Sequence, residues 1–429
     1  MPSNWSDMAW QIPLSDLDFG PEEAAAAQRV LQSKWLSMGP ETQAFEEEFA
    51  SLTGTRHAVA VSNGTAALHL AFLALGLGAG DGIIQPAVNF VASANMTKAA
   101  GATPIFADIC SLDEPTISPK SLGQILSTLN SQPSNPRAKA VVVMHYGGYC
   151  CRMAEIRALC RDHGLAIIED ACHAVGAWYC REPQDPVPAG PRGSRQESPL
   201  SLGSDLPVAV GALGEVGCFS FFGNKNLVTG EGGMLTTNRD ELAEKARNLR
   251  SHGMSTPTWD RHQGHAATYD VLAHGYNCRL DDLRSALGRE QLKKLERNNQ
   301  RRRALTALYW EKLAPLEERG WVLPFKRIPT FGVRLSARSR HPCTAAHLLA
   351  AVAPDVTTRR RCAEALKAAN IQTSLHYPLV PGFAAFRETA RVPELPVSKS
   401  FCERVLTLPL YPTMMEAQVE AVCAALNCN

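Results

Sequence analysis

The sequence lacks an excess of charge of either sign. Its 43 Lys and Arg and 42 Asp and Glu give a formal net charge of +1. Nucleic acids and anionic membrane surfaces attract proteins chiefly through clustered positive charge. Because the two signs are so evenly balanced, the composition gives no electrostatic basis for either partner. We expect no binding to nucleic acid or membrane.

Long hydrophobic runs are missing as well. No apolar run reaches the roughly 18 residues that a membrane-spanning helix needs. The segment Met1–Trp10 contains Asp7 and does not form the basic and then apolar leader that directs secretion. We therefore expect a cytoplasmic protein without a membrane segment.

Cysteine pairs at the spacing of a metal site are also absent. The chain has 13 cysteines, an odd number, scattered without a single Cys-x-x-Cys pair. Zinc sites typically use such closely spaced ligands. We therefore expect no metal. The cysteines are interpreted as reduced thiols in a cytosol, several of them simply small buried apolar residues.

What the sequence does contain is an alternation of strand-like and helix-like segments. Of its 429 residues, 45% are hydrophobic and 20% are charged, as is usual for a globular protein. Strands are expected at His57–Val61, Gly82–Gln85, Thr103–Ala107, Ala140–Met144, Leu165–Glu169, Val216–Phe221 and Gly233–Thr237, and helices at Thr65–Leu75, Val91–Ala100, Met153–His163 and Asp240–Arg250. This alternation predicts an α/β fold whose mostly parallel sheet is covered on both faces. Ligands of such sheets bind beyond the carboxyl ends of the strands.

The pattern changes after residue 280. Asp281–Leu313 is long and charged with apolar residues at helical spacing, which predicts a helix leading from the sheet domain to a smaller one. Further helices are expected at Cys362–Asn370 and Glu416–Leu426. We expect a large domain over residues 1–290 and a small C-terminal domain over residues 291–429.

One segment of the large domain breaks the alternation. Arg181–Leu213 holds six Pro, four Gly and four Ser and has no aromatic residue. Such a segment cannot bury enough apolar surface to offset the entropy lost on ordering. We predict a surface loop, inserted near the mouth of the ligand cleft.

A lysine follows one of the predicted strands. Phe219–Asn226 places Lys225 in a turn, and glycines within Thr229–Met234 let the backbone bend sharply. A lysine at the carboxyl end of a strand points into the ligand crevice, where partial burial lowers its pKa and makes its amine a nucleophile. A surface lysine in an ordinary turn is the alternative.

A carboxylate closes another strand. Within Ile167–His173, Asp170 follows buried strand residues, where an unpaired charge is costly. A pyridinium nitrogen is a suitable partner, because an aspartate beside it keeps the ring protonated and so an electron sink. His173 lies three residues on, within reach of the same crevice. The alternatives are an Asp that caps a helix and a His that satisfies a hydrogen bond of the core.

Two further motifs suit a phosphorylated aromatic ligand. Within Ser62–Leu68, Gly64 and Thr65 lie at a predicted helix N-terminus, whose free N–H groups and the Thr65 hydroxyl can bind phosphate. Phe90 ends Pro86–Phe90 and could lie flat on a cofactor ring. A plain helix cap and a core phenylalanine are the alternatives.

The order of these motifs is that of fold-type I pyridoxal-phosphate enzymes, and the chain resembles one of their families, the DegT/DnrJ/StrS sugar aminotransferases. The resemblance covers nearly the whole length and implies the aspartate-aminotransferase-like α/β fold with a smaller α+β C-terminal domain. Its motifs are Ile12–Ser15, Met38–Pro40, Ser62–Leu68, Glu169–His173, Ser220–Gly233, Gly275–Leu280, Gln372–Pro378 and Leu408–Pro412. The block that joins Lys225 to Glu231-Gly232-Gly233 is highly specific to this family.

The resemblance implies pyridoxal 5'-phosphate as cofactor and a role for each matching residue. Lys225 matches the Schiff-base lysine, Asp170 the aspartate on the pyridine nitrogen, and His173 the residue near the ring hydroxyl. Cofactor contacts are implied for Gly64, Thr65, Phe90, Asp170, His173, Ser220, Lys225 and Asn277.

A homodimer is implied as well. Asn277 matches an asparagine that reaches the cofactor phosphate of the other subunit, so the two active sites would be shared. His376 and Tyr377 match a segment near the substrate.

The activity implied is the transfer of an amino group from glutamate or glutamine to a keto-sugar, commonly nucleotide-linked. Amination of a cyclitol ketone or another natural-product ketone is the alternative of the same class. A non-catalytic regulatory or sensing protein on the same fold is the alternative from another class, and the intact Lys225 and Asp170 argue against it. Thr330–Asp355 departs from the family pattern, so the sequence does not identify the acceptor.

Overall fold

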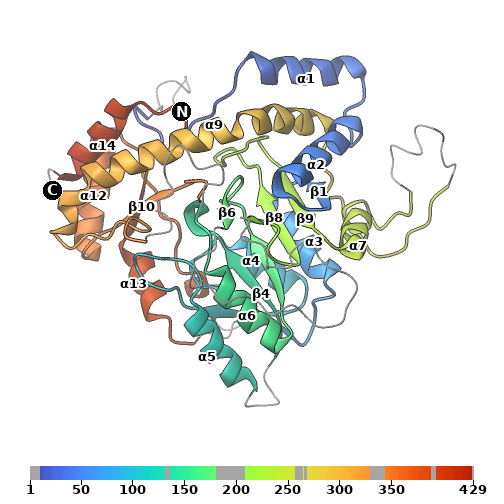
Figure 1. Ribbon diagram of the computed structural model, residues 1–429, viewed down its shortest axis with the longest axis horizontal. Coiled ribbons are helices and arrows are strands. Elements are labelled where there is room, and N and C mark those ends of the chain that lie inside the picture. Colours follow the sequence, from blue (N-terminus) through green and yellow to red (C-terminus); the bar gives the residue numbers. More distant parts are fainter. Residues whose placement is uncertain are drawn as a thin grey trace.

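The computed structural model describes residues 10–130, 136–179, 208–256, 264, 268–328, 344–387 and 393–427. Its centre is a seven-stranded sheet in the order β1-β9-β8-β5-β4-β2-β3 (Figure 1). The strands are β1 (His57–Val61), β2 (Asp81–Pro86), β3 (Thr103–Ala107), β4 (Arg137–Met144), β5 (Ala166–Asp170), β8 (Val216–Ser220) and β9 (Gly233–Thr237). All the strands expected from the sequence are present, with closely similar bounds.

Within this sheet, β9 is the strand that runs against its neighbours. It pairs antiparallel with β1 and with β8, whereas the other four pairs are parallel. Parallel neighbours need long crossover connections, which helices supply here. The prediction of an α/β fold with a mostly parallel sheet is confirmed.

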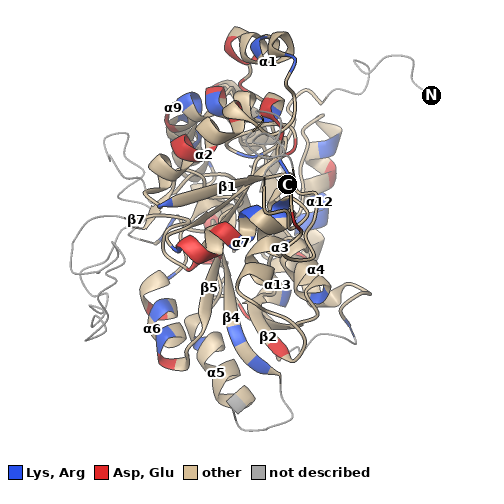
Figure 2. Ribbon diagram, turned by 90° about the vertical axis from the view of Figure 1, so that its right-hand side faces the viewer, with Lys and Arg blue, Asp and Glu red and all other residues tan. Residues whose placement is uncertain are grey.

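Helices cover both faces of the sheet, because successive strand residues point to opposite sides. Ala58 and Ala60 of β1 face one core, and Val59 and Val61 face the other. The first face is covered by α2 (Pro40–Thr53), α5 (Pro119–Asn130) and α6 (Met153–His163), and the second by α3 (Gly64–Ala74), α4 (Ala92–Ala99) and α7 (Asp240–Arg250). Charged residues lie mainly on the helices, and the strands between them carry few (Figure 2).

One long helix, α9 (Asp282–Lys312), crosses the molecule and joins its two parts (Figure 1). Asp281 caps its N-terminus, since the carboxylate accepts the backbone N–H of Arg284 at 2.8 Å. The helix packs on α1 (Pro21–Ser33) and α2 of the sheet part, and on α10 (Ala314–Glu317) and α14 (Glu416–Asn427) of the C-terminal part. The long helix expected at Asp281–Leu313 is confirmed.

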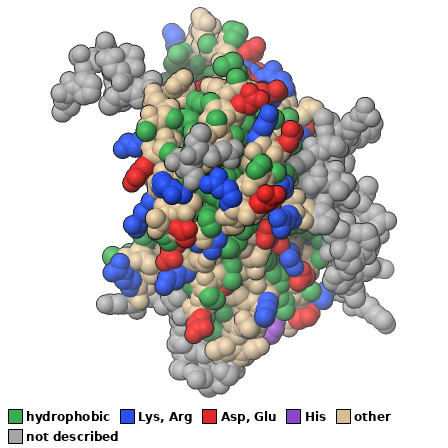
Figure 3. All heavy atoms as spheres, turned by 90° about the vertical axis from the view of Figure 1, so that its left-hand side faces the viewer, with side chains coloured by type: hydrophobic (Ala, Val, Ile, Leu, Met, Phe, Trp, Pro, Cys, Tyr) green, Lys and Arg blue, Asp and Glu red, His purple; other side chains and the backbone are tan. Residues whose placement is uncertain are grey.

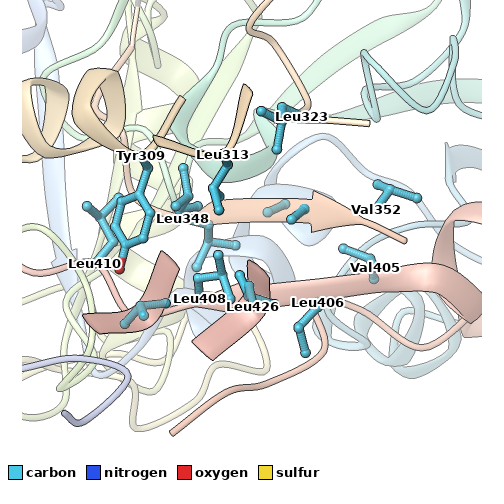
Figure 4. Packing of buried hydrophobic residues seen from close by; sticks show 14 of the residues in the cluster. Tyr309, Leu313, Leu323, Leu348, Val352, Val405, Leu406, Leu408, Leu410 and Leu426 are labelled. Carbon is cyan, nitrogen blue, oxygen red and sulfur yellow. The ribbon is translucent and has the colours of Figure 1, made fainter. Parts of the chain in front are cut away.

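The C-terminal part has its own small core. β10 (Leu349–Val352) pairs antiparallel with β11 (Val405–Leu408), accompanied by α12 (Val356–Ala368), α13 (Pro396–Arg404) and α14. Figure 4 shows Tyr309 of α9 beside Leu410, and Leu313 beside Leu348. β10 and β11 are not predicted from the sequence, because runs of four mostly apolar residues suit a strand and a helix equally well.

The first described residues belong with this C-terminal core. Ile12 forms a β-bridge with Ile371, and the N–H of Leu14 donates to Oε1 of Gln372 at 2.9 Å. The helix α9 also passes residue 290 without a break. A domain boundary at residue 290 stays a prediction. If the chain is divided into two domains, the segment of Ile12 groups with the C-terminal part and not with the sheet part that follows it in sequence.

The end of the segment expected to be a surface loop is buried. β7 (Val208–Ala209) pairs with β6 (Trp178–Tyr179), and the backbone N–H groups of Gly211, Leu213 and Gly214 donate to the carboxylate of Glu169 at 2.7–2.9 Å. Glu169 is fully buried, and a buried charge needs such donors. The prediction of a surface loop is therefore wrong for residues 208–213. The rest of that segment, residues 181–207, lies outside the described residues.

Charges of both signs are interspersed on the surface. Figure 3 shows Lys and Arg side chains next to Asp and Glu side chains across the face that it draws. That face lacks the extended positive field on which nucleic-acid binding depends. No helix within the described ranges is both long and apolar enough to span a membrane.

Replacing Gly288 with Leu should destabilise the protein. A Cβ atom at Gly288 would lie 2.6 Å from the ring of Phe45, which is fully buried between α2 and α9. Overpacking of a core costs about 1–3 kcal/mol. We expect the midpoint of unfolding in urea, followed by circular dichroism, to fall accordingly.

Gly382→Ala is the matched control, because a Cβ atom at Gly382 meets no other atom within 4 Å. An unfolding midpoint of Gly288→Leu equal to that of the parent protein would contradict the packing of α2 against α9.

Candidate active site

The lysine turn lies at the carboxyl end of β8. After Ser220 the chain turns, and the N–H of Lys225 donates to the carbonyl of Phe222 at 2.9 Å. Lys225 is half-buried, and burial lowers the pKa of its amine, although Cys172 and the carboxylate of Asp170 act in the opposite direction. A larger share of this amine is therefore neutral than in an exposed lysine. The alternative of a surface lysine is wrong.

Asp170 ends β5, the strand beside β8 in the sheet, and is 4% exposed. Its Oδ1 accepts the N–H of Cys172 at 3.3 Å, and its Oδ2 accepts the side-chain N–H of Asn89 at 3.4 Å. Both contacts are long for hydrogen bonds, so the carboxylate retains capacity for a stronger, cationic partner. The next element along the described chain is the strand β6 rather than a helix, so the helix-cap alternative is wrong.

The predicted phosphate cradle lies beside the end of β8. Gly64 begins α3, and a Cβ atom on it would lie 2.8 Å from Cβ of Ser220. A glycine is therefore needed for this approach, which brings the first N–H groups of α3 next to the Ser220 hydroxyl. Thr65 is half-buried at the same terminus.

Asn63 also caps α3, since its Oδ1 accepts the N–H of Ala66 at 2.8 Å. The plain helix cap is thus confirmed. It does not exclude the cradle, because the cap occupies the third N–H group of the helix and leaves the N–H groups of Gly64 and Thr65 at the terminus.

His173 joins the sheet part to the C-terminal part. Its Nδ1 accepts the N–H of Gly147 at 3.4 Å, so its Nε2 carries the proton and donates to the hydroxyl of Tyr377 at 2.8 Å. Burial, and then the positive charge of Lys225, hold the pKa of His173 well below its usual value. The ring is therefore neutral, and the Tyr377 hydroxyl keeps its own proton for donation to a ligand.

Phe90 and His376 complete this side of the site. Phe90 is 55% exposed, with its ring centroid 5.9 Å from that of Tyr377, so the alternative of a core phenylalanine is wrong. Nδ1 of His376 lies 3.0 Å from the hydroxyl of Thr407, and its carbonyl accepts the hydroxyl of Tyr146 at 2.5 Å. Burial, and then Lys225, lower the pKa of His376 to about 4.

Asn277 lies at the surface of the chain, with an exposed side chain. It forms a β-bridge with Ser251, and the carbonyl of the next residue, Cys278, accepts the N–H of Ser62 at 2.8 Å. These contacts attach the segment of Asn277 to the loop that carries the cradle. Its role toward a second subunit stays a prediction.

Three polar residues at the site are missed by the sequence analysis. Asn89 contacts Asp170, and Asn226 lies 2.8 Å from His347 beside the lysine turn. Asn226 directly follows Lys225, so its place in the motif was a usable signal. His347 is the single polar residue of the apolar run 345–353, and a polar residue that interrupts a buried run usually has a hydrogen-bonding role.

The ten cysteines within the described ranges are free thiols. Burial, and then the nearby charge of Asp170, raise the pKa of Cys172 and Cys218 well above the usual value. Among the described residues, no group of three or more His, Cys, Asp or Glu side chains is arranged to hold a metal ion.

Comparison with known proteins identifies the family of this chain. The sequence matches the DegT/DnrJ/EryC1/StrS aminotransferase family over residues 18–427. The chain belongs to this family. The resemblance and the enzyme class expected from the sequence are thereby confirmed, and the protein is an enzyme of an aminotransferase family.

Relatives are similar over almost the whole chain. The spore coat polysaccharide biosynthesis protein SpsC of Bacillus subtilis (strain 168) is 36% identical over 429 residues, covering 98% of this chain and 96% of that protein. The crystal structure of S. venezuelae DesV is 32% identical with a TM-score of 0.78, covering 97% of this chain and 98% of DesV. The aminotransferase TlmJ from Streptoalloteichus hindustanus is 29% identical with a TM-score of 0.79 and the same two coverages, 97% and 98%. The aspartate-aminotransferase-like fold is confirmed by these likenesses.

Acid should destabilise the protein through His376. Its pKa is about 4 in the folded protein and about 6.5 in an exposed histidine. Between these values the unfolded chain binds a proton that the folded chain does not, so the free energy of unfolding falls as the pH drops through this window. We expect His376 to contribute on the order of 2 kcal/mol to the difference in unfolding free energy between pH 7 and pH 5.

Urea unfolding at the two pH values measures this difference. His376→Gln should reduce it, whereas His163→Gln, which replaces an exposed histidine at the end of α6, should leave it unchanged. An identical pH dependence in His376→Gln and the parent would show that the pKa of His376 is not lowered in the folded protein.

Proposed function

We propose that the protein is a pyridoxal-phosphate-dependent aminotransferase that moves an amino group from glutamate or glutamine to a nucleotide-linked keto-sugar. The observation that carries the proposal is the half-buried Lys225, whose amine lies near the carboxylate of Asp170 at the carboxyl ends of two adjacent strands. Membership of the aminotransferase family supports it.

The residues present fit the cofactor. Its phosphate would be held by the N-terminus of α3 at Gly64 and Thr65 together with Ser220, where a Cβ atom on Gly64 would close the approach. Asp170 would hold a proton on the ring nitrogen, and the exposed Phe90 would cover the ring. When bound, the cofactor supplies an electron sink for the carbon that bears the amino group.

Lys225 would act as the proton carrier. Burial lowers the pKa of its amine, so a larger share of Nζ is neutral than in an exposed lysine. The neutral Nζ can accept a proton from the α-carbon of the amino donor and deliver it again. The same steps in reverse would add the amino group to the acceptor. His173 stays neutral beside Lys225 and therefore does not compete for this proton.

The sugar acceptor is supported by the relatives. SpsC is named for spore coat polysaccharide biosynthesis, and the Helicobacter pylori aminotransferase PseC, 25% identical with a TM-score of 0.77 and covering 97% of this chain and 98% of PseC, is described as involved in the biosynthesis of pseudoaminic acid. Tyr377 and His376 offer hydroxyl and imidazole groups for sugar hydroxyls. A cyclitol or another natural-product ketone would meet the same groups. The free thiols suit a reducing compartment, so we propose a cytoplasmic enzyme.

Colour tests the proposal. The cofactor-loaded protein should be yellow, and adding L-glutamate or L-glutamine should remove the long-wavelength absorbance, whereas a regulatory protein would keep its colour. A panel of nucleotide-linked keto-sugars should then restore the colour. Borohydride reduction followed by mass spectrometry should place the cofactor on Lys225.

Lys225→Ala should lose the colour and the reaction with the donor, and Lys245→Ala, on α7, serves as the control. Cofactor attached to another lysine in the parent protein would refute the assignment of Lys225. A coloured protein that neither donor bleaches would refute the aminotransferase.

We also propose a homodimer whose active sites are shared, with Asn277 of each chain acting on the cofactor phosphate of the other. The exposed Asn277 belongs to a segment attached to the loop of Ser62, next to the cradle. In a symmetric dimer each chain would donate the same residue to its partner. Cofactor binding would then stabilise the dimer by linkage.

A mixed dimer tests this arrangement. Chains carrying Lys225→Ala and chains carrying Asn277→Ala are given different affinity tags, and the mixed species is purified on both. If Asn277 acts on the partner's site, one site carries both lesions and the other carries neither, so half of the parental activity in the donor reaction returns. No recovery in the mixed dimer would show that Asn277 serves its own chain.

A further inference from the structure

The side chain of Asn226, the residue after Lys225, is held at both of its polar atoms. Its Nδ2 donates to Oδ1 of Asn299 at 2.7 Å and to the carbonyl of Ala345 at 2.8 Å. Its Oδ1 lies 2.8 Å from Nδ1 of His347. Asn226 is 7% exposed, so water competes little for these bonds. One side chain thereby joins the lysine turn, α9 and the segment before β10.

These contacts decide the tautomer of His347. Both amide hydrogens of Asn226 are donated elsewhere, so its oxygen faces His347 and can only accept. Nδ1 of His347 therefore carries the proton, and Nε2 carries the lone pair. Asn299 is oriented in the same way, because its Nδ2 donates to the carbonyl of Val175 at 2.9 Å and its oxygen faces Asn226.

His347 in turn lies against His173. The two ring centroids are 4.3 Å apart, at an interplanar angle of 43°. His347 is 4% exposed, and within the described part of the chain its Nε2 has no hydrogen-bond partner. Burial, and then the neighbouring His173 and Lys225, hold the pKa of His347 well below its usual value. The ring therefore adds bulk behind His173 without adding charge beside Lys225.

We infer that Asn226 and His347 are positioning residues for the amine of Lys225 and the ring of His173. Asn226 holds the backbone directly after Lys225, which limits where Nζ can reach. His347 supports the face of His173, whose Nε2 donates to Tyr377. The catalytic meaning of this inference rests on the proposed function, which assigns Lys225 and His173 to the reaction.

Five variants separate the possible roles. Asn226→Ala removes the amide, His347→Leu removes the ring, and the double variant removes both. His347→Asn is the conservative rescue, because its amide nitrogen lies as many bonds from Cα as Nδ1 does and can donate to Asn226. In His347→Gln the amide nitrogen takes the place of Nε2 instead.

Asn298→Ala is the matched control. Asn298 is the neighbouring buried amide of α9, and its oxygen accepts a hydrogen bond from Arg297. The titratable groups that face the Lys225 amine are Asp170, Cys172, His173, His347 and His376. Asn226→Ala and Asn298→Ala leave all of them unchanged, and the other variants change His347 alone.

The first measurement is the pH at which Lys225 is half-reactive toward acetic anhydride, read by mass spectrometry on protein freed of cofactor. A loosened turn exposes the amine, so the midpoint should rise by about half a pH unit or more in Asn226→Ala, toward that of an ordinary lysine. The second is the rate constant of bleaching at saturating L-glutamate. It should fall about tenfold, with the half-saturating concentration nearly unchanged, because positioning rather than binding is lost.

Coupling between the two residues gives the decisive pattern. The inference is supported if Asn226→Ala and His347→Leu change the acetylation midpoint and the bleaching rate by similar amounts and the double variant changes them no further. It also requires that His347→Asn restores both values and that His347→Gln does not. The inference is overturned if folded Asn226→Ala has the midpoint and the rate of the parent protein. It is also overturned if the rate losses of the two single variants multiply in the double variant. If Asn226→Ala does not fold, the pair His347→Asn and His347→Gln decides, and equal behaviour of these two overturns the inference.

The acetylation midpoint requires neither cofactor nor donor, so it separates this inference from the proposed function. A parent protein that no donor bleaches refutes the proposed function alone. Nitrogen-15 chemical shifts of labelled histidines add a second independent readout. A His347 ring with its proton on Nε2, assigned by comparison with His347→Asn, overturns the hydrogen-bond arrangement from which the inference starts.

Discussion

The site depends on keeping an amine and a carboxylate close together where water is scarce. Asp170 ends β5, and Ser220, which precedes the lysine turn, ends the adjacent β8. Parallel pairing brings these two strand ends to the same edge of the sheet, and the turn after Ser220 brings the Lys225 amine near enough to feel the charge of Asp170. Each would be costly to bury alone, and each lowers the cost of burying the other. The glycine contacts, the hydrogen bonds of Glu169 and the C-terminal part all help to hold these two groups in place.

Glycines let the start of α3 approach the ends of the strands closely. Gly64 permits Ser220 to lie against the start of α3, and a Cβ atom on Gly233 would lie 2.5 Å from the carbonyl carbon of Asn63. These glycines bring the N-terminus of α3 next to the ends of β8 and β9. Glu169, which precedes Asp170, holds the same strand from the other direction, because its carboxylate accepts the N–H groups of Gly211, Leu213 and Gly214.

The C-terminal part closes the site. His347, His376 and Tyr377 all reach toward Lys225 or His173 from beyond α9, and their hydrogen bonds to Asn226, Thr407 and His173 fix their orientations. Burial keeps His173, His347 and His376 neutral, so the site holds several imidazoles without opposing the charge of Lys225.

Much of the sheet and of the candidate site could be predicted from the sequence, because local rules govern both. Strands such as Thr103–Ala107 and Gly233–Thr237 follow from apolar runs between turn residues, and Lys225 and Asp170 follow from their places after such strands. The short strands β10 and β11 and the buried end of the inserted segment could not be predicted. Their residues are apolar or small without a clear period, and they are ordered by distant partners such as Glu169.

The residue types of the chain and their order are enough to indicate the family and a candidate catalytic lysine. The tertiary structure alone decided which groups touch. His347 is 122 residues from Lys225 along the chain, and its tautomer depends on carbonyls of Ala345 and Val175 that no local pattern brings together. Hydrogen-bond direction is settled only when every donor around a buried amide has its acceptor, and that is a property of the packed chain.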